Sequence, residues 1–255
     1  MTTALITGAT AGIGAAFAER FASKHYHLVL VARDEVRLAA TAKRLLEAGA
    51  SEVETLPADL STQEGRAAVE ARLAAAEQPV DILVNNAGFG LNDSFRRSSI
   101  EDEERLLEVL VRAVLRLTHA ALPGMIERGR GAVINVSSVA AFVPRGTYSA
   151  AKAWVVSFSE SVAAELGGTG VQCLAVCPGF TRTEFHERGG MDIKDIPSWM
   201  WLNVDQVVDS AMRDLGRGNV VSIPGAQYKA IIAAARYTPR TIVKKVSRSR
   251  SKRWE

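Results

Sequence analysis

The stretch Thr7-Gly8-Ala9-Thr10-Ala11-Gly12-Ile13-Gly14 decides the fold. It follows an apolar run at residues 4–7 and leads directly into a helical pattern over residues 15–23. A glycine backbone has no Cβ, so it can turn tightly and approach a pyrophosphate closely. The free N–H groups at the start of the next helix can then bind that pyrophosphate. Alone, this pattern could be an ordinary turn, but between a first strand and a first helix it predicts a dinucleotide-binding turn.

Outward from this turn, the chain alternates short apolar runs with longer, alanine-rich helical patterns. The helical patterns repeat apolar residues every three or four positions, as in Leu106, Leu107, Leu110, Val114, Leu117 and Ala121. The apolar runs lie at residues 4–7, 27–32, 52–56, 81–85, 132–137, 171–177 and 220–223. Runs that are apolar on both faces predict a parallel sheet covered by helices on each side. We therefore predict an α/β fold of the Rossmann type, with a doubly wound, mostly parallel seven-stranded sheet and helices on both faces.

The sequence predicts one domain over residues 1–235 and a basic C-terminal tail over residues 236–255. No linker rich in Pro, Gly or Ser interrupts the first 180 residues. Residues 184–203 depart from the alternation, with Gly189-Gly190, Pro197 and the cluster Trp199-Met200-Trp201. An insertion of this size after a strand is typical of a substrate lid.

Composition excludes several classes of protein. Of the 255 residues, 47% are hydrophobic and 23% are charged, which excludes disorder, collagen and coiled coil. No run of 18 uncharged apolar residues exists, and no basic region or cleavage site follows Met1, so we expect neither a membrane span nor a secretory signal. We expect a cytoplasmic protein. Cys173 and Cys177 are too few for a disulfide framework and predict two reduced, buried thiols in preference to a redox or metal pair.

The net charge of +3 conceals an asymmetry. The tail holds eight Lys or Arg and one acidic residue, so the body of the chain is mildly acidic, which argues against nucleic-acid binding. The tail also contains Ile242, Val243, Val246 and Trp254. A solvated, disordered tail is the favoured interpretation, and weak contact with an anionic membrane surface is the alternative.

Further motifs follow the glycine turn in order. They are Asp59-Leu60, Asn85-Asn86-Ala87-Gly88, Ser137-Ser138, Tyr148-x-x-x-Lys152 and Pro178-Gly179. Together with Gly-x-x-x-Gly-x-Gly, they make the sequence closely resemble the short-chain dehydrogenase/reductase superfamily over about residues 1–225. The resemblance implies an oxidoreductase that moves a hydride between a nicotinamide cofactor and a carbonyl or secondary alcohol.

The resemblance also implies a set of cofactor-binding residues. Asp59 would meet the adenine, the Asn85-to-Gly88 segment would line the adenosine ribose, and Thr183, with Thr181 as second candidate, would meet the pyrophosphate. The full set is Gly8, Thr10, Gly12, Ile13, Gly14, Arg33, Asp59, Leu60, Asn86, Ala87, Gly88, Tyr148, Lys152, Pro178, Gly179, Thr181 and Thr183. No metal site is expected.

Three residues would carry the catalysis that the resemblance implies. Tyr148 and Lys152 are four apart in a helical pattern, so they project from one face. A tyrosine with the ordinary pKa of about 10 is a poor proton donor, and a nearby ammonium is expected to lower that pKa. Ser138 would hydrogen-bond the substrate carbonyl, with Ser137 as a possible substitute.

The end of the second strand predicts the cofactor preference. Relatives that prefer NAD carry an acidic residue where this chain has Ala32, and Arg33 follows. A guanidinium can pair with a 2′-phosphate, so the sequence favours NADP(H) over NAD(H). The alternative is that the neighbouring Asp34 occupies Arg33.

Two departures from the family pattern stand out. Relatives usually carry an asparagine that holds a water linked to the lysine, and counting back from Leu122-Pro123 places Leu110 there. A leucine cannot hold water, so the proton relay must run differently. The interval from Ser138 to Tyr148 is also a few residues shorter than usual. These departures keep open a catalytically weak NADP(H)-binding sensor or scaffold as the alternative function.

Aromatic residues and helix faces suggest partners. Phe89, Phe142, Phe180 and residues 199–201 either form an apolar pocket for a hydrophobic substrate or plug the core. The helical patterns over residues 101–125 and 148–166 are apolar over a wide arc. We expect a homodimer or homotetramer through them, the alternative being that the extra apolar positions face the sheet.

Overall fold

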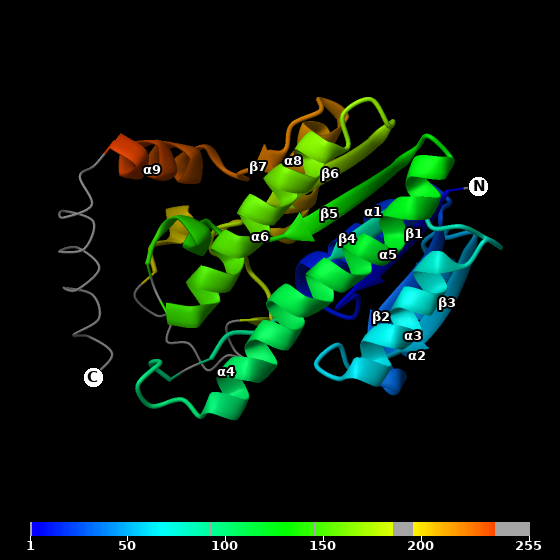
Figure 1. The fold of residues 1–255 in the computed structure, drawn as a ribbon, viewed down its shortest axis with the longest axis horizontal. Coiled ribbons are helices and arrows are strands. Elements are labelled where there is room, and N and C mark those ends of the chain that lie inside the picture. The colour runs from blue at the N-terminus through cyan, green and yellow to red at the C-terminus, as the bar shows by residue number, and fades with distance from the viewer. Residues whose placement is uncertain (1, 92, 145, 186–195, 238–255) are drawn as a thin grey trace.

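The computed structural model describes residues 2–91, 93–144, 146–185 and 196–237, which form a sheet flanked by helices (Figure 1). Every pair of neighbouring strands in this sheet is parallel. The order of the strands is β3-β2-β1-β4-β5-β6-β7. Their bounds are β1 Thr3–Thr7, β2 His27–Ala32, β3 Glu52–Pro57, β4 Ile82–Asn85, β5 Gly131–Val136, β6 Val171–Val176 and β7 Val221–Ser222. The predicted doubly wound, seven-stranded α/β fold is confirmed, and the sheet is parallel throughout.

The helices follow the strands in the predicted alternation. They are α1 Gly12–Ala22, α2 Glu35–Glu47, α3 Gln63–Ala74, α4 Ile100–Leu107, α5 Ala113–Glu127, α6 Gly146–Glu165, α8 Val204–Gly216 and α9 Ala226–Tyr237. Three short elements complete the described residues: the π-helical η1 Glu108–Arg112 and the 3₁₀ turns η2 Val139–Phe142 and η3 Ser198–Met200. Side chains that accept a hydrogen bond from the first turn begin several helices; they are Asp34 at α2, Thr62 at α3, Ser99 at α4 and Asn203 at α8.

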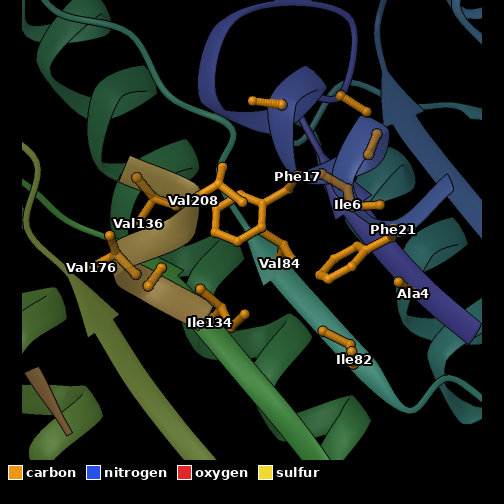
Figure 2. Close-up of a cluster of buried hydrophobic side chains, with 14 of the residues drawn as sticks. Ala4, Ile6, Phe17, Phe21, Ile82, Val84, Ile134, Val136, Val176 and Val208 are labelled. Carbon is orange, nitrogen blue, oxygen red and sulfur yellow. The ribbon is translucent and has the colours of Figure 1, made fainter. Parts of the chain in front are cut away.

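One face of the sheet packs against α1, α2 and α8. Alternate residues of the strands point to this face, because successive side chains of a strand point in opposite directions. Phe17 and Phe21 of α1 lie over them, with Val208 of α8 beside Phe17 (Figure 2). Both phenylalanines are fully buried. The buried cluster on this face is larger than the one on the opposite face.

The other face packs against α3, α5 and α6, which lie on the near side of the sheet in Figure 1. A buried polar network crosses this layer. The Asn85 amide nitrogen donates to Asn135 Oδ1 at 2.9 Å and to Thr118 Oγ1 at 3.2 Å. The Asn135 amide nitrogen donates in turn to Ser159 Oγ at 3.0 Å. These bonds join β4, β5, α5 and α6, so they fix the register of α6 against the sheet.

The helical run Ile100–Glu127 is long and apolar enough to cross a membrane by length and composition alone. In this fold it is a core helix, because Leu106, Leu110 and Leu117 are fully buried. The π-helical turn Glu108–Arg112 interrupts it. Before and within this turn, Leu106 and Leu110 pack beside Tyr148, and after it Leu117 packs on the sheet. The helix therefore packs beside Tyr148 up to the π turn and on the sheet after it.

The structure can be compared with the predictions for the two cysteines, the tail and the lid. Cys173 and Cys177 are free and buried, and burial raises the pKa of each thiol to about 12, so both are neutral thiols as predicted. The helix α9 includes residues 236 and 237, which the sequence had assigned to the tail. Residues 238–255 of the predicted tail and residues 186–195 of the predicted lid lie outside the described residues.

Replacing Asn135 by Ala should lower the free energy of unfolding by about 1–3 kcal/mol, because the buried amide of Asn85 loses its acceptor. Urea unfolding of the two proteins measures the difference. Gln172→Ala, at an exposed position of the neighbouring strand β6, is the control and should change stability by less than about 0.5 kcal/mol. Equal stabilities of the wild type and Asn135→Ala would contradict the role given to the network.

Candidate active site

The site begins where β1 and β4 lie side by side. The chain winds outward in opposite directions from this pair, and in open parallel sheets ligands bind at the carboxyl ends of such strands. The Asn86 amide nitrogen donates to the carbonyls of Thr7, at 2.9 Å, and Gly8, at 3.2 Å. The Thr7 hydroxyl accepts from the backbone N–H groups of Asn86 and Ala87, both at 3.0 Å. The ends of the two strands are thus tied together.

The glycine turn after β1 has the geometry that its sequence predicts. Gly8 and Gly12 have φ values of +66° and +57°, in the left-handed region that favours glycine. A Cβ on Gly14 would overlap the Gly8 carbonyl and the Asn86 amide. The first turn of α1, which begins at Gly12, therefore lies directly against the backbone of Gly8. This turn and the helix N-terminus fit a pyrophosphate.

Charged residues lie at the adjoining end of β2. Asp34 does not occupy Arg33, because its carboxylate accepts from Arg37 N at 2.9 Å as the cap of α2. Among the described residues, the exposed guanidinium of Arg33 makes no hydrogen bond or ion pair. Its charge does reach Asp59. Burial raises the pKa of Asp59, but hydrogen bonds from Ser61 and the charges of Arg33 and Arg105 outweigh this, so the pKa lies below its usual value.

The segment after β6 comes next to the glycine turn. A Cβ on Gly12 would lie 3.0 Å from Thr183 Cγ2, so Thr183 faces the glycine turn. Next to it, both oxygens of Glu184 accept from Arg37 Nη2, at 3.0 and 3.2 Å. The hydroxyl of Thr181 is buried and bonds to Gly179 O at 3.0 Å. Of the two predicted threonines, Thr183 is therefore the one that faces the turn.

Ser138 and Tyr148 lie together beyond β5. Ser138 begins η2, where its hydroxyl accepts from Ala140 N at 3.1 Å, and its side chain lies close enough to Tyr148 to act on the pKa of that phenol. Tyr148 is in the first turn of α6 and is half-buried. The short turn η2 closes the brief interval between the two residues. Ser137 is no substitute, because its buried hydroxyl donates to Lys152 O at 2.7 Å.

The predicted direction of the Tyr148 pKa is wrong for this structure. Burial raises the pKa of Tyr148 to about 12, although the hydrogen bond from Ser138 acts in the opposite direction. The Lys152 ammonium is 5.8 Å from the centre of the tyrosine ring, and its charge does not offset the loss of water around a phenolate. At neutral pH Tyr148 is therefore a protonated phenol.

Lys152 is buried one helical turn after Tyr148. Its Nζ donates to Val136 O at 2.8 Å. Burial lowers the pKa of Lys152 to about 8, so the side chain is still mainly an ammonium at neutral pH. The last carbonyl of β5 therefore holds the charge of this lysine in place.

Leu110 lies in the π turn and is fully buried. A Cβ on Gly88 would lie 2.8 Å from Leu110 Cδ2 and 3.8 Å from Lys152 Nζ. The leucine thus packs on the glycine beside the lysine. The polar partner that the structure gives Lys152 is the main-chain carbonyl of Val136, and a proton relay that runs differently from that of relatives stays a prediction.

The predicted aromatic residues do not gather in one place. Phe89 packs with Tyr148 and Leu110, and Arg105 lies over its ring at 5.4 Å. Phe142 packs with Val156 in a separate cluster. Phe180 lies against the main core, 5.8 Å from the Trp201 ring, and Trp199 is exposed.

The other predicted cofactor residues lie along the same edge of the sheet, some with the side chain buried and some with it partly exposed. Leu60 and Pro178 are buried, so only their backbones can face a ligand. Ile13 packs partly on the main core, and Thr10 is half-buried in the glycine turn. The predicted residues thus lie along the carboxyl ends of β1 to β6.

Sequence reasoning missed Tyr228 of α9. Its hydroxyl accepts from Phe180 N at 2.9 Å and donates to Met200 O at 2.5 Å. Burial raises its pKa, so it stays a neutral phenol. Tyr228 lies far in sequence from every motif that the sequence analysis used. The feature that could have indicated it is a tyrosine within an otherwise apolar helical pattern.

Comparison with known proteins agrees with this geometry. Residues 2–192 match the family model described as short chain dehydrogenase. The NADP-dependent 3-hydroxy acid dehydrogenase of Salmonella typhi is 37% identical over 189 residues, which are 71% of this chain and 73% of that protein.

Solved structures extend the likeness to most of the fold. A short-chain dehydrogenase from Sphingobium yanoikuyae, solved in complex with NADPH, is 40% identical, with a TM-score of 0.84 over 92% of this chain and 94% of that one. The bulky-bulky ketone specific alcohol dehydrogenase from Comamonas testosteroni is 35% identical, with a TM-score of 0.80 over 92% of each chain. The protein described above belongs to the short-chain dehydrogenase/reductase family and is an oxidoreductase that acts on CH–OH or C=O groups.

Proposed function

We propose that this protein is an NADP(H)-dependent oxidoreductase that moves a hydride between the nicotinamide and a hydrophobic carbonyl or secondary alcohol, with Tyr148 as general acid and base. The observation that carries the proposal is the juxtaposition of Ser138, Tyr148 and Lys152 beside the glycine turn. The bound nicotinamide supplies the hydride chemistry. The chain's own residues supply position, charge and a proton.

The residues divide the proton chemistry between them. In the direction of carbonyl reduction, the phenol of Tyr148 donates its proton to the substrate oxygen, for which its protonated state at neutral pH suits it. The Ser138 hydroxyl donates a hydrogen bond to the same oxygen and stabilises the charge that develops there. The Lys152 ammonium, fixed on Val136 O, lies close enough to stabilise the phenolate left behind.

Two features support the preference for NADP(H). Arg33 is exposed, directly follows β2 and makes no side-chain hydrogen bond within the described residues, although its charge acts on Asp59, while Ala32 offers no carboxylate that would repel a phosphate. The capping role of Asp34 removes the neighbouring acid as a competitor. The NADPH bound in the Sphingobium structure is consistent with the same choice.

An apolar wall beside Tyr148 supports a hydrophobic substrate. Leu106, Leu110 and Ala151 form its buried part, and Phe89 and Leu91 pack against it. The ring of Phe185 lies 6.0 Å from that of Tyr148 on the lid side. A carbonyl oxygen that reaches Ser138 and Tyr148 would place its apolar substituents between these surfaces.

Tyr148→Phe should lower kcat for carbonyl reduction by about 10²–10⁴-fold and leave NADPH binding intact, because the change removes one proton donor and no pyrophosphate contact. Steady-state kinetics on a panel of ketones and aldehydes, with fluorescence titration of NADPH, measures both. Tyr26→Phe is the matched control, since Tyr26 stacks on Phe21 in the core far from Ser138.

Lys152→Ala should harm both turnover and cofactor binding. If Tyr148→Phe keeps more than about a tenth of the wild-type kcat, general acid catalysis by Tyr148 is wrong. A wild type that binds NADPH and turns over no member of the panel would favour the sensor or scaffold function instead.

NADPH should bind roughly ten- to hundredfold more tightly than NADH, because a charge-assisted contact with Arg33 contributes about 1.5–3 kcal/mol. Arg33→Ala should remove most of this difference by weakening NADPH binding alone. Arg44→Ala, on the same side of the sheet but further along α2, should keep it. Equal affinities of the wild type for the two cofactors would remove the assignment.

We also propose a homodimer or homotetramer through α5 and α6. The alternative, that the extra apolar positions face the sheet, holds for Leu117 and Ala121. It does not hold for Leu115 and Ile126, whose side chains are 43% and 42% exposed. Leu115 and Ile126 lie on the exposed side of α5, and a second copy could bury such apolar side chains.

Leu115→Glu should shift the protein towards the monomer in analytical ultracentrifugation at micromolar concentration, because a carboxylate in the interface would lose its water. Val36→Glu, at a more exposed apolar residue of α2 on the opposite face, should leave the assembly unchanged. A wild type that sediments as a monomer would defeat the proposal.

A further inference from the structure

The C-terminal helix α9 reaches the segment that borders the active site through one side chain. Tyr228 is only 2% exposed, and its hydroxyl uses both of its hydrogen-bonding directions on that segment. It accepts from the N–H of Phe180, which follows β6, and it donates to the carbonyl of Met200, which precedes α8. We call residues 179–182 the first stem and residues 200–202 the second stem.

The two stems also bond to each other. Leu202 N donates to Phe180 O at 2.8 Å, and Arg182 N donates to Leu202 O at 3.0 Å. Thr181 and Leu202 form a parallel bridge, and the rings of Phe180 and Trp201 lie 5.8 Å apart. The stems therefore move as one unit, and Tyr228 attaches that unit to α9.

The ring of Tyr228 requires the glycine in the first stem. A Cβ on Gly179 would overlap the ring, so the ring lies directly on the Gly179 backbone. A second contact comes from the neighbouring residue, since Gln227 Nε2 donates to Trp199 O at 3.3 Å. The attachment is thus built from a buried ring, a hydroxyl with two partners and an exposed amide.

The first stem leads to the reacting groups in two directions. Towards the N-terminus, Pro178 O accepts from Val139 N at 3.0 Å, which ties the stem to the residue after Ser138. Towards the C-terminus, the chain reaches Phe185, whose ring is 6.0 Å from that of Tyr148. A shift of the first stem would therefore move Val139, next to Ser138, and Phe185, next to Tyr148.

We propose that Tyr228 is a positioning residue that fixes the lid-side wall of the substrate site through its bonds to Phe180 and Met200. This inference rests on the proposed carbonyl reduction. It concerns a residue of the C-terminal helix, which lies beyond the 2–192 region that matches the family model. Tyr228 does not touch the reacting atoms, and its effect is expected on substrate binding more than on the chemical step.

Tyr228→Phe tests the proposal, because it removes the hydroxyl and keeps the ring. The KM for a bulky ketone should rise about five- to tenfold, the effect of losing one or two hydrogen bonds, while kcat changes less than about threefold. Binding of NADPH should change less than KM does, because the Gly8–Gly14 turn is held by Asn86 and makes none of its hydrogen bonds to Tyr228. Gln227→Ala, at the half-buried residue that bonds Trp199 O, should give a smaller rise of KM in the same direction.

Two control variants separate positioning from general destabilisation. Ser222→Ala removes a buried bond from Ser222 Oγ to Asp214 Oδ2, of 2.6 Å, that involves neither stem. Tyr26→Phe removes a hydroxyl from a stacked ring elsewhere. Both should keep the wild-type KM. The proposal is overturned if Tyr228→Phe leaves KM unchanged, or if Ser222→Ala raises KM as much.

Hydrogen exchange provides a readout that does not need turnover. Peptides that contain the Phe180 amide should exchange at least about tenfold faster in Tyr228→Phe than in the wild type, since that N–H loses its acceptor. Unchanged exchange would overturn the attachment itself. A wild type that reduces no carbonyl, with faster exchange in the variant, would instead reject the proposed function and leave the attachment standing.

Discussion

The bonds from one side-chain amide, that of Asn86, to the carbonyls of Thr7 and Gly8 hold the cofactor edge of the sheet together. They join the ends of two strands that the chain enters about 80 residues apart. Without them, two buried carbonyls would lose a donor at the point where the glycine backbone folds most tightly on itself. The start of α1, and with it the anion-binding end of that helix, takes its position from this junction.

A second set of bonds places the reacting groups. Helix α6 is tied to β5 at three levels, by Ser137 Oγ to Lys152 O, by Lys152 Nζ to Val136 O and by the Asn135 amide to Ser159 Oγ. Apolar packing alone would let a helix slide along a sheet by a fraction of a turn with little change in buried area. Directional bonds remove this freedom, so Tyr148 meets Ser138 in one register.

The parts of the structure that depend on local pattern could be predicted from the sequence. The strands follow from runs that are apolar on both faces, and β2 was predicted to the residue. The glycine turn follows from its spacing. The π turn could not be predicted, because the apolar spacing from Leu106 to Ala121 fits an uninterrupted α-helix and the choice of neighbours decides otherwise.

The remaining misses depend on contacts between distant parts of the chain. The raised pKa of Tyr148 depends on how much water the folded protein removes from the phenol, which no spacing encodes. The role of Tyr228 depends on a meeting between residues 28 and 48 positions apart. The motifs that carry the resemblance end before Tyr228, so neither they nor local pattern could indicate it.

The π turn also constrains how this gene can change length. A π turn holds one residue more than an α turn, and each residue adds about 100° of rotation to a helix. Deleting one codon within residues 108–112 would therefore convert the π turn to an α turn and keep the downstream face of α5, from Ala113 to Met125, on the sheet it covers. A deletion after residue 112 would instead rotate the rest of α5 by about 100°, so length variation in this helix should be tolerated in the π turn and purged in the turns that follow it.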